Sequence, residues 1–427
     1  MSDPGSLLEG LVWPALDAAR NAPPHLILLA LLALVVPALL TLYLLLHLLA
    51  PKPRAPIASE KTYVTSAPDG SRKTAQLPCW YDRWLAEHRR GVAVAATAPG
   101  GSSESAFVDP GNIEPAEVAV TVVVPAYNEE DRILPTLLEM VGYLDANFGR
   151  HPTAPAPAPS SPTAALLSPR LAHKKRQVPA ARESVTAGYE ILIVNDGSRD
   201  RTVEVALQFA REHGLHDVVR IVSLERNRGK GGGVTHGFRH ARGEYVLFAD
   251  ADGASRFSDL GKLIEGVEDV VDGSMRGVAI GSRGHLVGSE AVVKRSALRN
   301  FLMKSFHFIL MILTPPATSR IRDTQCGFKL FSRASLPHII PYMHSEGWIF
   351  DIEMLMLAES APATPVLASD GSVIGTSPGI KVAEVPIDWH EVDGSKMSLM
   401  KDSINMAIGL AVLRASWMLG VYRRRLT

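Results

Sequence analysis

The chain has 427 residues, 46% of them hydrophobic, and its 44 Lys plus Arg residues balance 44 Asp plus Glu residues. This length allows one large α/β domain with attachments and excludes three ordinary domains. A net charge of zero argues against a protein that binds nucleic acid through bulk positive charge. The two cysteines, Cys79 and Cys326, exclude a disulfide framework and a cysteine metal cage, which suits a reducing compartment.

The first predicted element is a membrane anchor at residues 26–50. This stretch is almost entirely apolar, and Pro37 and His47 interrupt it. At about 1.5 Å per residue, a helix of this length spans roughly 37 Å, enough to cross a hydrocarbon core of about 30 Å with some tilt. Its length and the acidic residues before it do not fit a cleavable signal peptide. A buried core helix, the alternative, rarely runs this long without a charge.

Charges on either side of the anchor predict its orientation. Lys52, Arg54 and Lys61 follow the apolar stretch, whereas Arg20 precedes it. Basic residues are enriched on the cytoplasmic side of a membrane span. We therefore expect residues 1–25 to form a short lumenal N-terminus and everything after residue 51 to lie in the cytoplasm.

The globular pattern is expected over residues 116–397, with three segments of different character around or inside it. Residues 51–115 are polar and mixed, which predicts a juxtamembrane linker with a short helix around residues 80–90. Residues 150–187 are rich in proline and alanine and cannot bury a core, which predicts a disordered insertion. Residues 398–427 are expected to form an amphipathic C-terminal helix.

Strand and helix patterns alternate through the globular domain. Apolar, β-branched runs predict strands, and apolar residues at helical spacing predict helices. In chain order the strands are expected at 118–127, 189–196, 218–225, 244–252 and 277–282, and the helices at 131–148, 202–213, 232–241 and 258–271. This alternation indicates an α/β fold with a mostly parallel central sheet covered on both faces, which binds ligands at the carboxyl ends of its strands.

Two later apolar segments carry charges. Residues 298–313 include Lys304, and residues 397–422 include Lys401 and Arg414. Such charges argue against full membrane spans and for amphipathic helices that lie in the interface. The alternative is that both are core helices of the globular domain. Membrane contact is favoured for the first segment, and both readings stay open for the second.

Polar motifs follow the first two predicted strands. Residues 125–130 read Pro-Ala-Tyr-Asn-Glu-Glu, and residues 195–198 read Asn-Asp-Gly-Ser. The second motif alone is an ordinary turn. As a pair, one at each strand end, they predict a site where backbone groups and Asp196 hold a uracil and its ribose.

Two aspartates end the strand predicted at 244–252. Alternation along a strand puts Asp250 and Asp252 on the same side, where their charges repel unless a cation lies between them. Oxygen ligands favour Mg²⁺ or Mn²⁺ over zinc, and a diphosphate would supply further ligands. Two solvated loop aspartates are the alternative.

A glycine-rich stretch at residues 227–233 opens the next helix and contains Lys230. Glycines, a lysine and a helix N-terminus together suit a bound anion. The stretch matches neither the P-loop nor the dinucleotide-binding pattern, which excludes ATPase and dinucleotide readings.

Together these motifs resemble the glycosyltransferase-A (GT-A) fold, in particular the large inverting family, glycosyltransferase family 2, that includes dolichyl-phosphate sugar synthases. The resemblance runs from residue 118 to about residue 400, apart from the insertion. The finer match is to the dolichyl-phosphate β-glucosyltransferases, and it rests on residues 253–257, 281–283, 294–299, 323–331 and 389–396. Mannose-transferring relatives typically differ at the Gln-Cys pair of the fourth stretch and directly after the metal motif.

The resemblance implies a role for each matching residue. The residues that would bind UDP-glucose are Pro125, Ala126, Tyr127, Glu129, Asp196, Gly197, Ser198, Lys230, Asp250, Ala251, Asp252, Gln325 and Trp348. Asp250 and Asp252 would hold Mg²⁺ or Mn²⁺ and, through it, the diphosphate. Arg283, Arg295 and Arg299 would receive the phosphate of the acceptor, dolichyl phosphate, and Arg283 would also be catalytic.

The implied reaction is one in-line displacement that gives dolichyl β-D-glucosyl phosphate for N-glycan precursor assembly. Its place would be the endoplasmic reticulum membrane, with the catalytic domain facing the cytosol. A phosphate monoester has a second pKa of about 6, so the acceptor is largely dianionic at pH 7 and needs positioning more than deprotonation. Asp351 is the candidate should a base exist. An alternative that stays open is that Asp351 caps the helix at residues 350–355.

Two alternatives stay open. A related enzyme would use the same chemistry with GDP-mannose or another nucleotide sugar. A non-catalytic membrane scaffold would have kept the fold and lost the activity. The presence of Asp250, Asp252 and the arginines argues against the scaffold.

Overall fold

The computed structural model describes residues 22–97, 113–150, 187–286, 305–306, 308–367, 372–392 and 399–424. It divides into two compact units, one of residues 1–50 with 411–425 and the other of residues 51–410 with 426–427. The candidate site and its contacts lie within the second unit.

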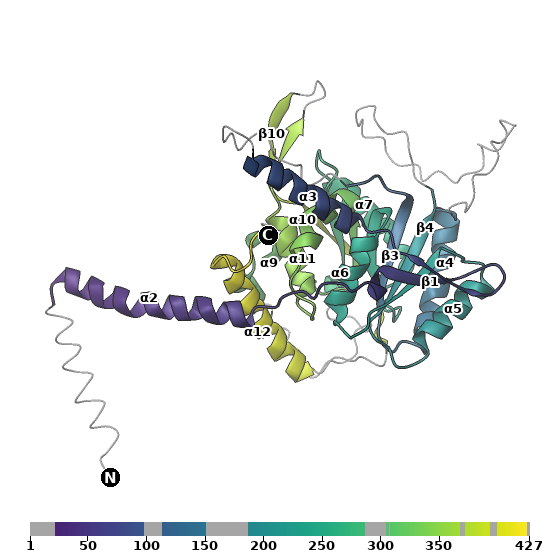
Figure 1. Ribbon diagram of the computed structural model, residues 1–427, viewed down its shortest axis with the longest axis horizontal. Coiled ribbons are helices and arrows are strands. Elements are labelled where there is room, and N and C mark those ends of the chain that lie inside the picture. Colours follow the sequence, from purple (N-terminus) through teal and green to yellow (C-terminus); the bar gives the residue numbers. More distant parts are fainter. Residues whose placement is uncertain are drawn as a thin grey trace, which may run out of the picture. The chain divides into compact units, whose positions relative to one another are not determined.

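In the first unit, helix α2 spans Pro24–Leu49, which confirms the predicted apolar helix (Figure 1). Its most apolar window has a mean hydropathy of 2.7, and 0% of that window is buried. The backbone turns to an extended conformation at Ala50, and Pro51 cannot continue a helix. By length and composition α2 can cross a membrane, and its insertion stays a prediction.

The second unit is built on a nine-stranded sheet with the order β11-β7-β8-β6-β3-β4-β5-β1-β2 (Figure 1). Its strands are β1 Thr62–Ser66, β2 Arg72–Gln76, β3 Val118–Ala126, β4 Tyr189–Asn195, β5 Val219–Ser223, β6 Gly243–Ala249, β7 Val278–Ser282, β8 Phe328–Ser332 and β11 Val382–Pro386. Strands β6, β3, β4 and β5 pair in parallel, as do β11 and β7, whereas β8 and β1 run antiparallel to both of their neighbours. The predicted α/β fold with a mostly parallel sheet is confirmed. Strands β9 Thr364–Leu367 and β10 Val373–Ser377 form a separate hairpin.

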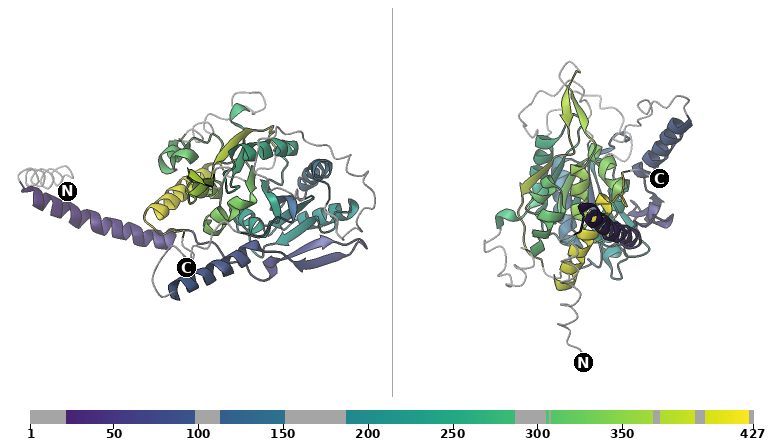
Figure 2. Two further views of the ribbon diagram at one scale, coloured as in Figure 1. Left: turned by 90° about the horizontal axis from the view of Figure 1, so that it is seen from above. Right: turned by 90° about the vertical axis from the view of Figure 1, so that its left-hand side faces the viewer.

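Helices cover both faces of the sheet (Figures 1 and 2). The other α-helices are α3 Trp80–Thr97, α4 Ile133–Asn147, α5 Thr202–Glu212, α6 Lys230–His240, α7 Leu260–Val270, α9 Pro316–Ser319, α10 Leu336–Ile339, α11 Phe350–Glu359 and α12 Leu399–Met418. Short 3-10 helices lie at η1 Ser59–Lys61, η3 Phe257–Asp259, η4 Gly284–Leu286, η5 Arg333–Ser335 and η6 Ile340–Tyr342. Helices α4, α5 and α7 share one apolar core with Val120, Val122 and Val124 of β3. Each predicted strand and helix of the globular domain is present, with its ends shifted by a few residues.

Glycines let α6 lie close to the opposite face of the sheet. A Cβ added at Gly237 would lie 2.4 Å from Cγ1 of Val123, and one at Gly233 would lie 3.4 Å from Cβ of Pro125. A side chain at Gly237 would therefore push the helix away from β3. The close packing brings the amino end of α6, which begins at Lys230, to the carboxyl end of β3.

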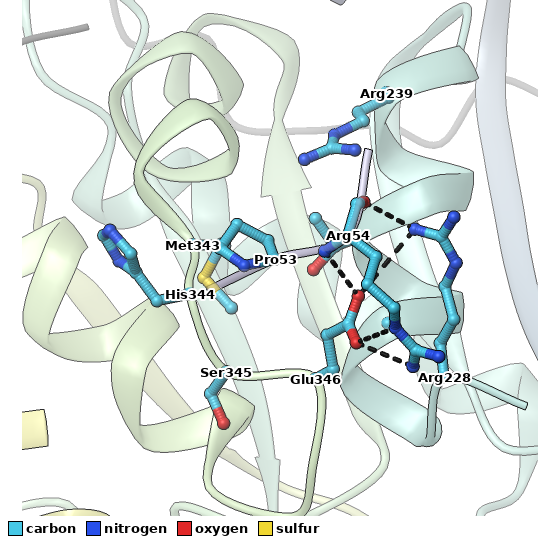
Figure 3. A pocket seen from close by; sticks show the side chains of 10 residues that line it. Pro53, Arg54, Arg228, Arg239, Met343, His344, Ser345 and Glu346 are labelled. Carbon is cyan, nitrogen blue, oxygen red and sulfur yellow. Dashed lines mark hydrogen bonds and ion pairs between the residues drawn. The ribbon is translucent and has the colours of Figure 1, made fainter. Parts of the chain in front are cut away.

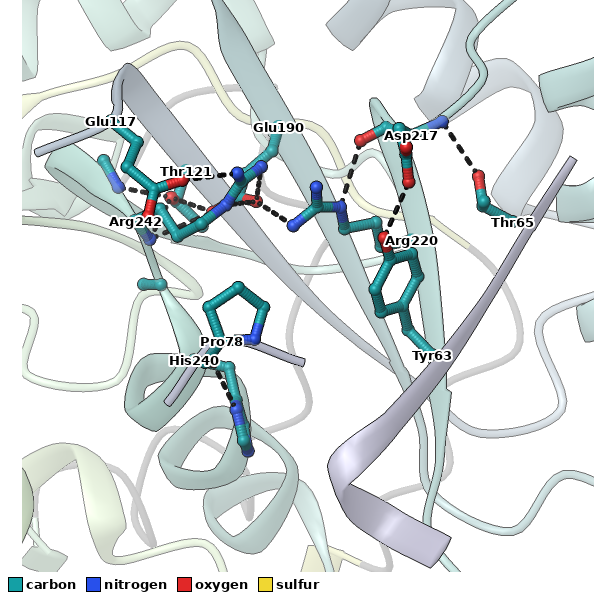
Figure 4. A network of polar contacts seen from close by, with 12 residues as sticks. Tyr63, Thr65, Pro78, Glu117, Thr121, Glu190, Asp217, Arg220, His240 and Arg242 are labelled. Carbon is teal, nitrogen blue, oxygen red and sulfur yellow. Dashed lines mark hydrogen bonds and ion pairs between the residues drawn. The ribbon is translucent and has the colours of Figure 1, made fainter. Parts of the chain in front are cut away.

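The segment expected to be a linker, residues 51–115, contains the predicted helix, as α3, but also two strands that were not predicted. Strands β1 and β2 extend the main sheet, and α3 follows them. Tyr63 donates its hydroxyl hydrogen to Oδ1 of Asp217 at 2.6 Å (Figure 4), and Thr65 donates to the carbonyl oxygen of Val219 at 2.7 Å. Each strand has only five residues, with polar side chains among them, so neither stands out from a polar stretch of sequence.

A buried ionic cluster lies near the amino end of β4. The Glu190 side chain is 2% exposed, and it accepts hydrogen bonds from Nε of Arg242 at 2.8 Å and from Nη1 of Arg220 at 3.3 Å (Figure 4). Burial raises the pKa of Glu190, but the two guanidinium groups outweigh burial and hold it below its ordinary value. This cluster links β4 to its neighbouring segments at the amino ends of the parallel strands, opposite the carboxyl ends where the candidate site lies.

The residues that flank the predicted insertion also lie at the amino end of β4. The backbone N–H of Gly188 donates to the carbonyl oxygen of Phe148 at 3.1 Å, so the segments before and after the insertion are held together. Residues 151–186 themselves lie outside the described residues.

Part of the first interfacial segment is described. Residues 308–313 are helical, with Phe308, Met311 and Ile312 exposed at 59%, 59% and 61% and Leu310 buried. This pattern is amphipathic, and membrane contact stays a prediction. In the second segment, α12 leaves Ile404 and Ile408 more than half exposed, at 53% and 58%.

Candidate active site

The two motifs predicted to meet at the strand ends lie side by side. Ala126 of β3 pairs with Asn195 of β4, and the N–H of Asp196 donates to the carbonyl oxygen of Ala126 at 2.8 Å. Beyond them, the N–H of Asn128 donates to Oγ of Ser198 at 3.0 Å. Gly197 has a φ of +75°, which favours glycine at this turn.

Asp196 joins these motifs to the glycine-rich loop. Its Oδ1 accepts the backbone N–H of Arg228 at 2.6 Å, and its Oδ2 accepts that of Gly229 at 2.8 Å. The side chain is buried, and this burial raises the pKa of Asp196 to about 6 in spite of the two N–H donors. Asp196 therefore shapes the loop that carries Lys230, in addition to the uridine contact that the resemblance implies.

Glu129 is engaged within the protein. Both of its carboxylate oxygens accept hydrogen bonds from the guanidinium of Arg132, each at 2.8 Å. Its backbone N–H donates to Oγ1 of Thr202 at 2.8 Å, which connects the first motif to α5. In this structure Glu129 orders the loop after β3, and its predicted contact with uridine stays a prediction.

Lys230 and Asp250 form an ion pair at the centre of the site. Nζ of Lys230 lies 2.7 Å from Oδ1 and 3.0 Å from Oδ2 of Asp250, and 5.8 Å from the centroid of the Trp348 ring. Desolvation lowers the pKa of Lys230, but the charges of Asp250 and Asp351 raise it by more, so the amine stays protonated at neutral pH. The sequence predicted that Lys230 contacts an anion and that Asp250 binds a metal, and the structure brings these two residues together.

Each predicted metal ligand has a glycine next to it. A Cβ at Gly327 would lie 1.9 Å from Oδ2 of Asp250, and the N–H of Asp250 donates to the carbonyl oxygen of Gly327 at 3.0 Å. Gly253, next to Asp252, has a φ of +72°. Gly327 belongs to the stretch 323–331 that carries the finer resemblance, but sequence reasoning assigned it no role.

The residues present fit a divalent cation that shares its coordination with a ligand. Asp250 and Asp252 offer carboxylate oxygens, which Mg²⁺ and Mn²⁺ prefer. Oδ1 of Asp252 accepts the N–H of Ala254 at 3.1 Å and keeps a second oxygen for a metal. Among the described residues, no group of three or more His, Cys, Asp or Glu could hold a metal. A bound ion would therefore take further ligands from the diphosphate and water.

Arg283 lies at the end of β7 in an ion pair with Asp323. Its Nε and Nη2 lie 2.6 Å and 2.8 Å from Oδ2 and Oδ1 of that carboxylate. Its guanidinium also stacks 5.3 Å from the ring centroid of Trp389. Desolvation lowers the pKa of Arg283, but the hydrogen bonds and charge of Asp323 outweigh it and raise the pKa.

A guanidinium has five N–H donors, and among the described residues Asp323 accepts from two of those of Arg283. With respect to the described residues, the side chain of Arg283 is 31% exposed, which fits a contact with an acceptor phosphate. The other two predicted acceptor contacts, Arg295 and Arg299, lie outside the described residues.

Asp351 does not cap α11. That helix begins at Phe350 and has no side-chain cap hydrogen bond. Asp351 instead forms a buried ion pair with Lys329, whose Nζ also donates to the carbonyl oxygen of Cys326 at 2.6 Å. Burial raises the pKa of Asp351, and the charges of Lys329 and Lys230 offset part of that rise.

Two further residues predicted to contact the donor, Trp348 and Gln325, are partly buried. Trp348 precedes α11. Nε2 of Gln325 lies 3.8 Å from Sδ of Met406. The Lys329 partner of Asp351 was missed from sequence, although it lies in the motif 323–331, because a lysine in an apolar strand looks the same whether it is buried or exposed.

The chain is similar in sequence to known glycosyltransferases. A protein-family model described as glycosyl transferase family 2 matches residues 177–336. Dolichyl-phosphate beta-glucosyltransferase of Saccharomyces cerevisiae is 37% identical over 398 residues, which cover 91% of this chain and 93% of the yeast protein. The Mus musculus protein of the same name is 35% identical over 309 residues, which cover 72% of this chain and 78% of that protein.

Solved structures are more distant. Glucosyl-3-phosphoglycerate synthase from Mycobacterium tuberculosis, in complex with Mn²⁺, UDP-glucose and phosphoglyceric acid, aligns with 70% of this chain and 80% of that chain. The identity is 15% and the TM-score is 0.41, a likeness too low to carry an argument about ligands.

Proposed function

Because the chain belongs to the dolichyl-phosphate β-glucosyltransferase family, we propose that it transfers glucose from UDP-glucose to dolichyl phosphate with inversion. The observation that carries this proposal is the 37% identity to the yeast relative across 91% of the chain. The product would be dolichyl β-D-glucosyl phosphate, which would serve N-glycan precursor assembly. Helix α2 would anchor the protein in the endoplasmic reticulum membrane, with the catalytic domain in the cytosol.

The site supports an in-line displacement. An oxygen of the acceptor phosphate would bond to C1 of glucose while the bond from C1 to the diphosphate breaks, and the electron pair would leave with UDP. Asp250 and Asp252 would hold Mg²⁺ or Mn²⁺, which supplies Lewis-acid stabilisation of the departing diphosphate when bound. Lys230, held at Asp250, adds a positive charge where the leaving group gains negative charge.

The acceptor phosphate is largely dianionic at neutral pH, so the reaction depends on positioning more than on a general base. Arg283 would orient that phosphate through the donors that Asp323 leaves available. Pro125, Tyr127 and Asp196 would hold the uridine at the ends of β3 and β4.

The test is transfer by the purified full-length protein in detergent, with dolichyl phosphate and a panel of UDP-glucose, GDP-mannose and other nucleotide sugars. We expect product from UDP-glucose, and its loss on chelation of divalent cations or in Asp252→Asn. Product from GDP-mannose in place of UDP-glucose would refute the assigned donor. Normal turnover of Asp252→Asn in chelator would refute the metal site.

A further inference from the structure

The segment that follows α2 in sequence lies against two loops of the site (Figure 3). The backbone N–H and Nε of Arg54 donate to Oε1 and Oε2 of Glu346, at 3.2 Å and 2.8 Å. Nη2 of Arg54 donates to the carbonyl oxygen of Asn227 at 3.2 Å. A single side chain thus holds the loop before α6 and the loop before α11.

Arg228 returns these contacts from the glycine-rich loop. Its side chain is 7% exposed, and its Nη1 donates to the carbonyl oxygen of Arg54 at 2.7 Å (Figure 3). Its Nη2 donates to the carbonyl oxygen of Ala55 at 3.1 Å and to Oε2 of the buried Glu60 at 2.6 Å. Charges buried in this way are stable only while their partners remain in place.

The two loops also meet through their backbones. The N–H of Gly232 donates to the carbonyl oxygen of Glu346 at 3.1 Å, and a Cβ at Gly229 would lie 2.7 Å from that same oxygen. The loops therefore have little room to shift independently. One of them carries Lys230, which pairs with Asp250, and the other leads to Trp348.

We propose that residues 53–60 form a strap that positions the donor side of the site, with Arg54 and Glu346 as its positioning residues. The strap acts through the two loops that place Lys230 and Trp348, and it touches no reacting atom. The inference rests on the proposed function for its activity readout. It gives the segment next to the predicted anchor an indirect part in binding the nucleotide sugar, through the two loops, beyond tethering the enzyme.

The test uses the full-length protein with Arg54→Ala, Glu346→Gln and the double variant. We expect KM for UDP-glucose to rise about tenfold in each single variant, as for the loss of a charged hydrogen bond, with KM for dolichyl phosphate unchanged. Because the two residues share one contact, the rise in KM of the double variant should be smaller than the product of the two single rises. The matched control is Arg72→Ala, which removes an exposed arginine that lies 4.0 Å from Glu204, and it should behave as wild type.

Hydrogen exchange separates the strap from the proposed reaction. The amide of Gly232 should exchange faster in Arg54→Ala and Glu346→Gln and not in Arg72→Ala, whichever sugar nucleotide the protein uses. A wild-type protein inactive with UDP-glucose would overturn the proposed function and leave this readout intact. Unchanged exchange and donor KM in both variants would overturn the strap. So would a lower thermal midpoint with normal donor KM, because that result indicates a role in stability alone.

Discussion

The buried pair of Lys329 and Asp351 allows a quantitative test. The two side chains are 0% and 4% exposed. In Lys329→Met the methionine keeps much of the stem volume but leaves the Asp351 carboxylate buried without its partner. Removing one member of a buried pair costs about 3–5 kcal/mol, so we expect a loss of that size in the free energy of unfolding.

The loss should depend on pH. Burial already raises the pKa of Asp351, and the Lys329 charge that offsets it disappears in the variant. An acid whose folded pKa is raised contributes stability at low pH that is lost as pH rises through the folded pKa. The loss in free energy of unfolding caused by Lys329→Met should therefore be larger at pH 8 than at pH 5. It should grow by up to about 1.4 kcal/mol for each pH unit between the pKa of Asp351 in the folded wild type and its higher pKa in the folded variant.

The assay is urea unfolding in detergent, followed by tryptophan fluorescence at both pH values. The control is Lys329→Met combined with Asp351→Asn, which removes the stranded charge and should recover most of the stability. A single variant as stable as wild type, or a double variant no better than the single, would refute the buried ion pair. Turnover of Asp351→Asn alone then tests whether Asp351 is a general base. A rate near wild type at every pH excludes that role.

Three further predictions concern the site itself. Gly327→Ala should abolish transfer while the protein stays folded by circular dichroism, because the new Cβ would displace the carboxylate of Asp250; retained activity would show that this approach is not needed. Arg283→Lys should cut turnover on dolichyl phosphate at least tenfold and leave UDP-glucose affinity by calorimetry unchanged, because lysine cannot both pair with Asp323 and present a planar fork to the acceptor phosphate; a parallel fall of both values would contradict it. Asp196 has a pKa raised to about 6, so its contribution to stability is lost as pH rises from about 4 to about 6, and Asp196→Asn should flatten the stability profile in that range; an unchanged profile would exclude Asp196 as its source.

The sequence predicted those parts of the fold in which local pattern and final environment agree. The long β-branched run of β3 is buried along nearly its whole length, so its hydrophobicity identified it. Strands β1 and β2 do not stand out in the sequence, because each has only five residues with polar side chains among them. The motif that contains β8 gives no local sign that this strand runs antiparallel to both of its neighbours.

Site residues were predictable one at a time, and their partners were not. The polar motifs at the carboxyl ends of β3, β4 and β6 are recognisable from the local sequence alone. The contact between Arg54 and Glu346 joins residues 292 positions apart, and nothing at either position indicates the other. The helix-cap reading of Asp351 was wrong for the same reason, since its partner Lys329 lies on a different element.

The hydrogen bond between Gly188 and Phe148 has a consequence for how this chain can vary. It closes the connection between α4 and β4 at the edge of the sheet away from the site, whatever the length of the chain in between. The entropic cost of closing a loop grows slowly, by about 0.6 kcal/mol for each doubling of its length. The number of residues between Phe148 and Gly188 can therefore change in evolution without moving Asp196 or Asp250. The same position is a permissive place to insert a purification tag or a reporter domain.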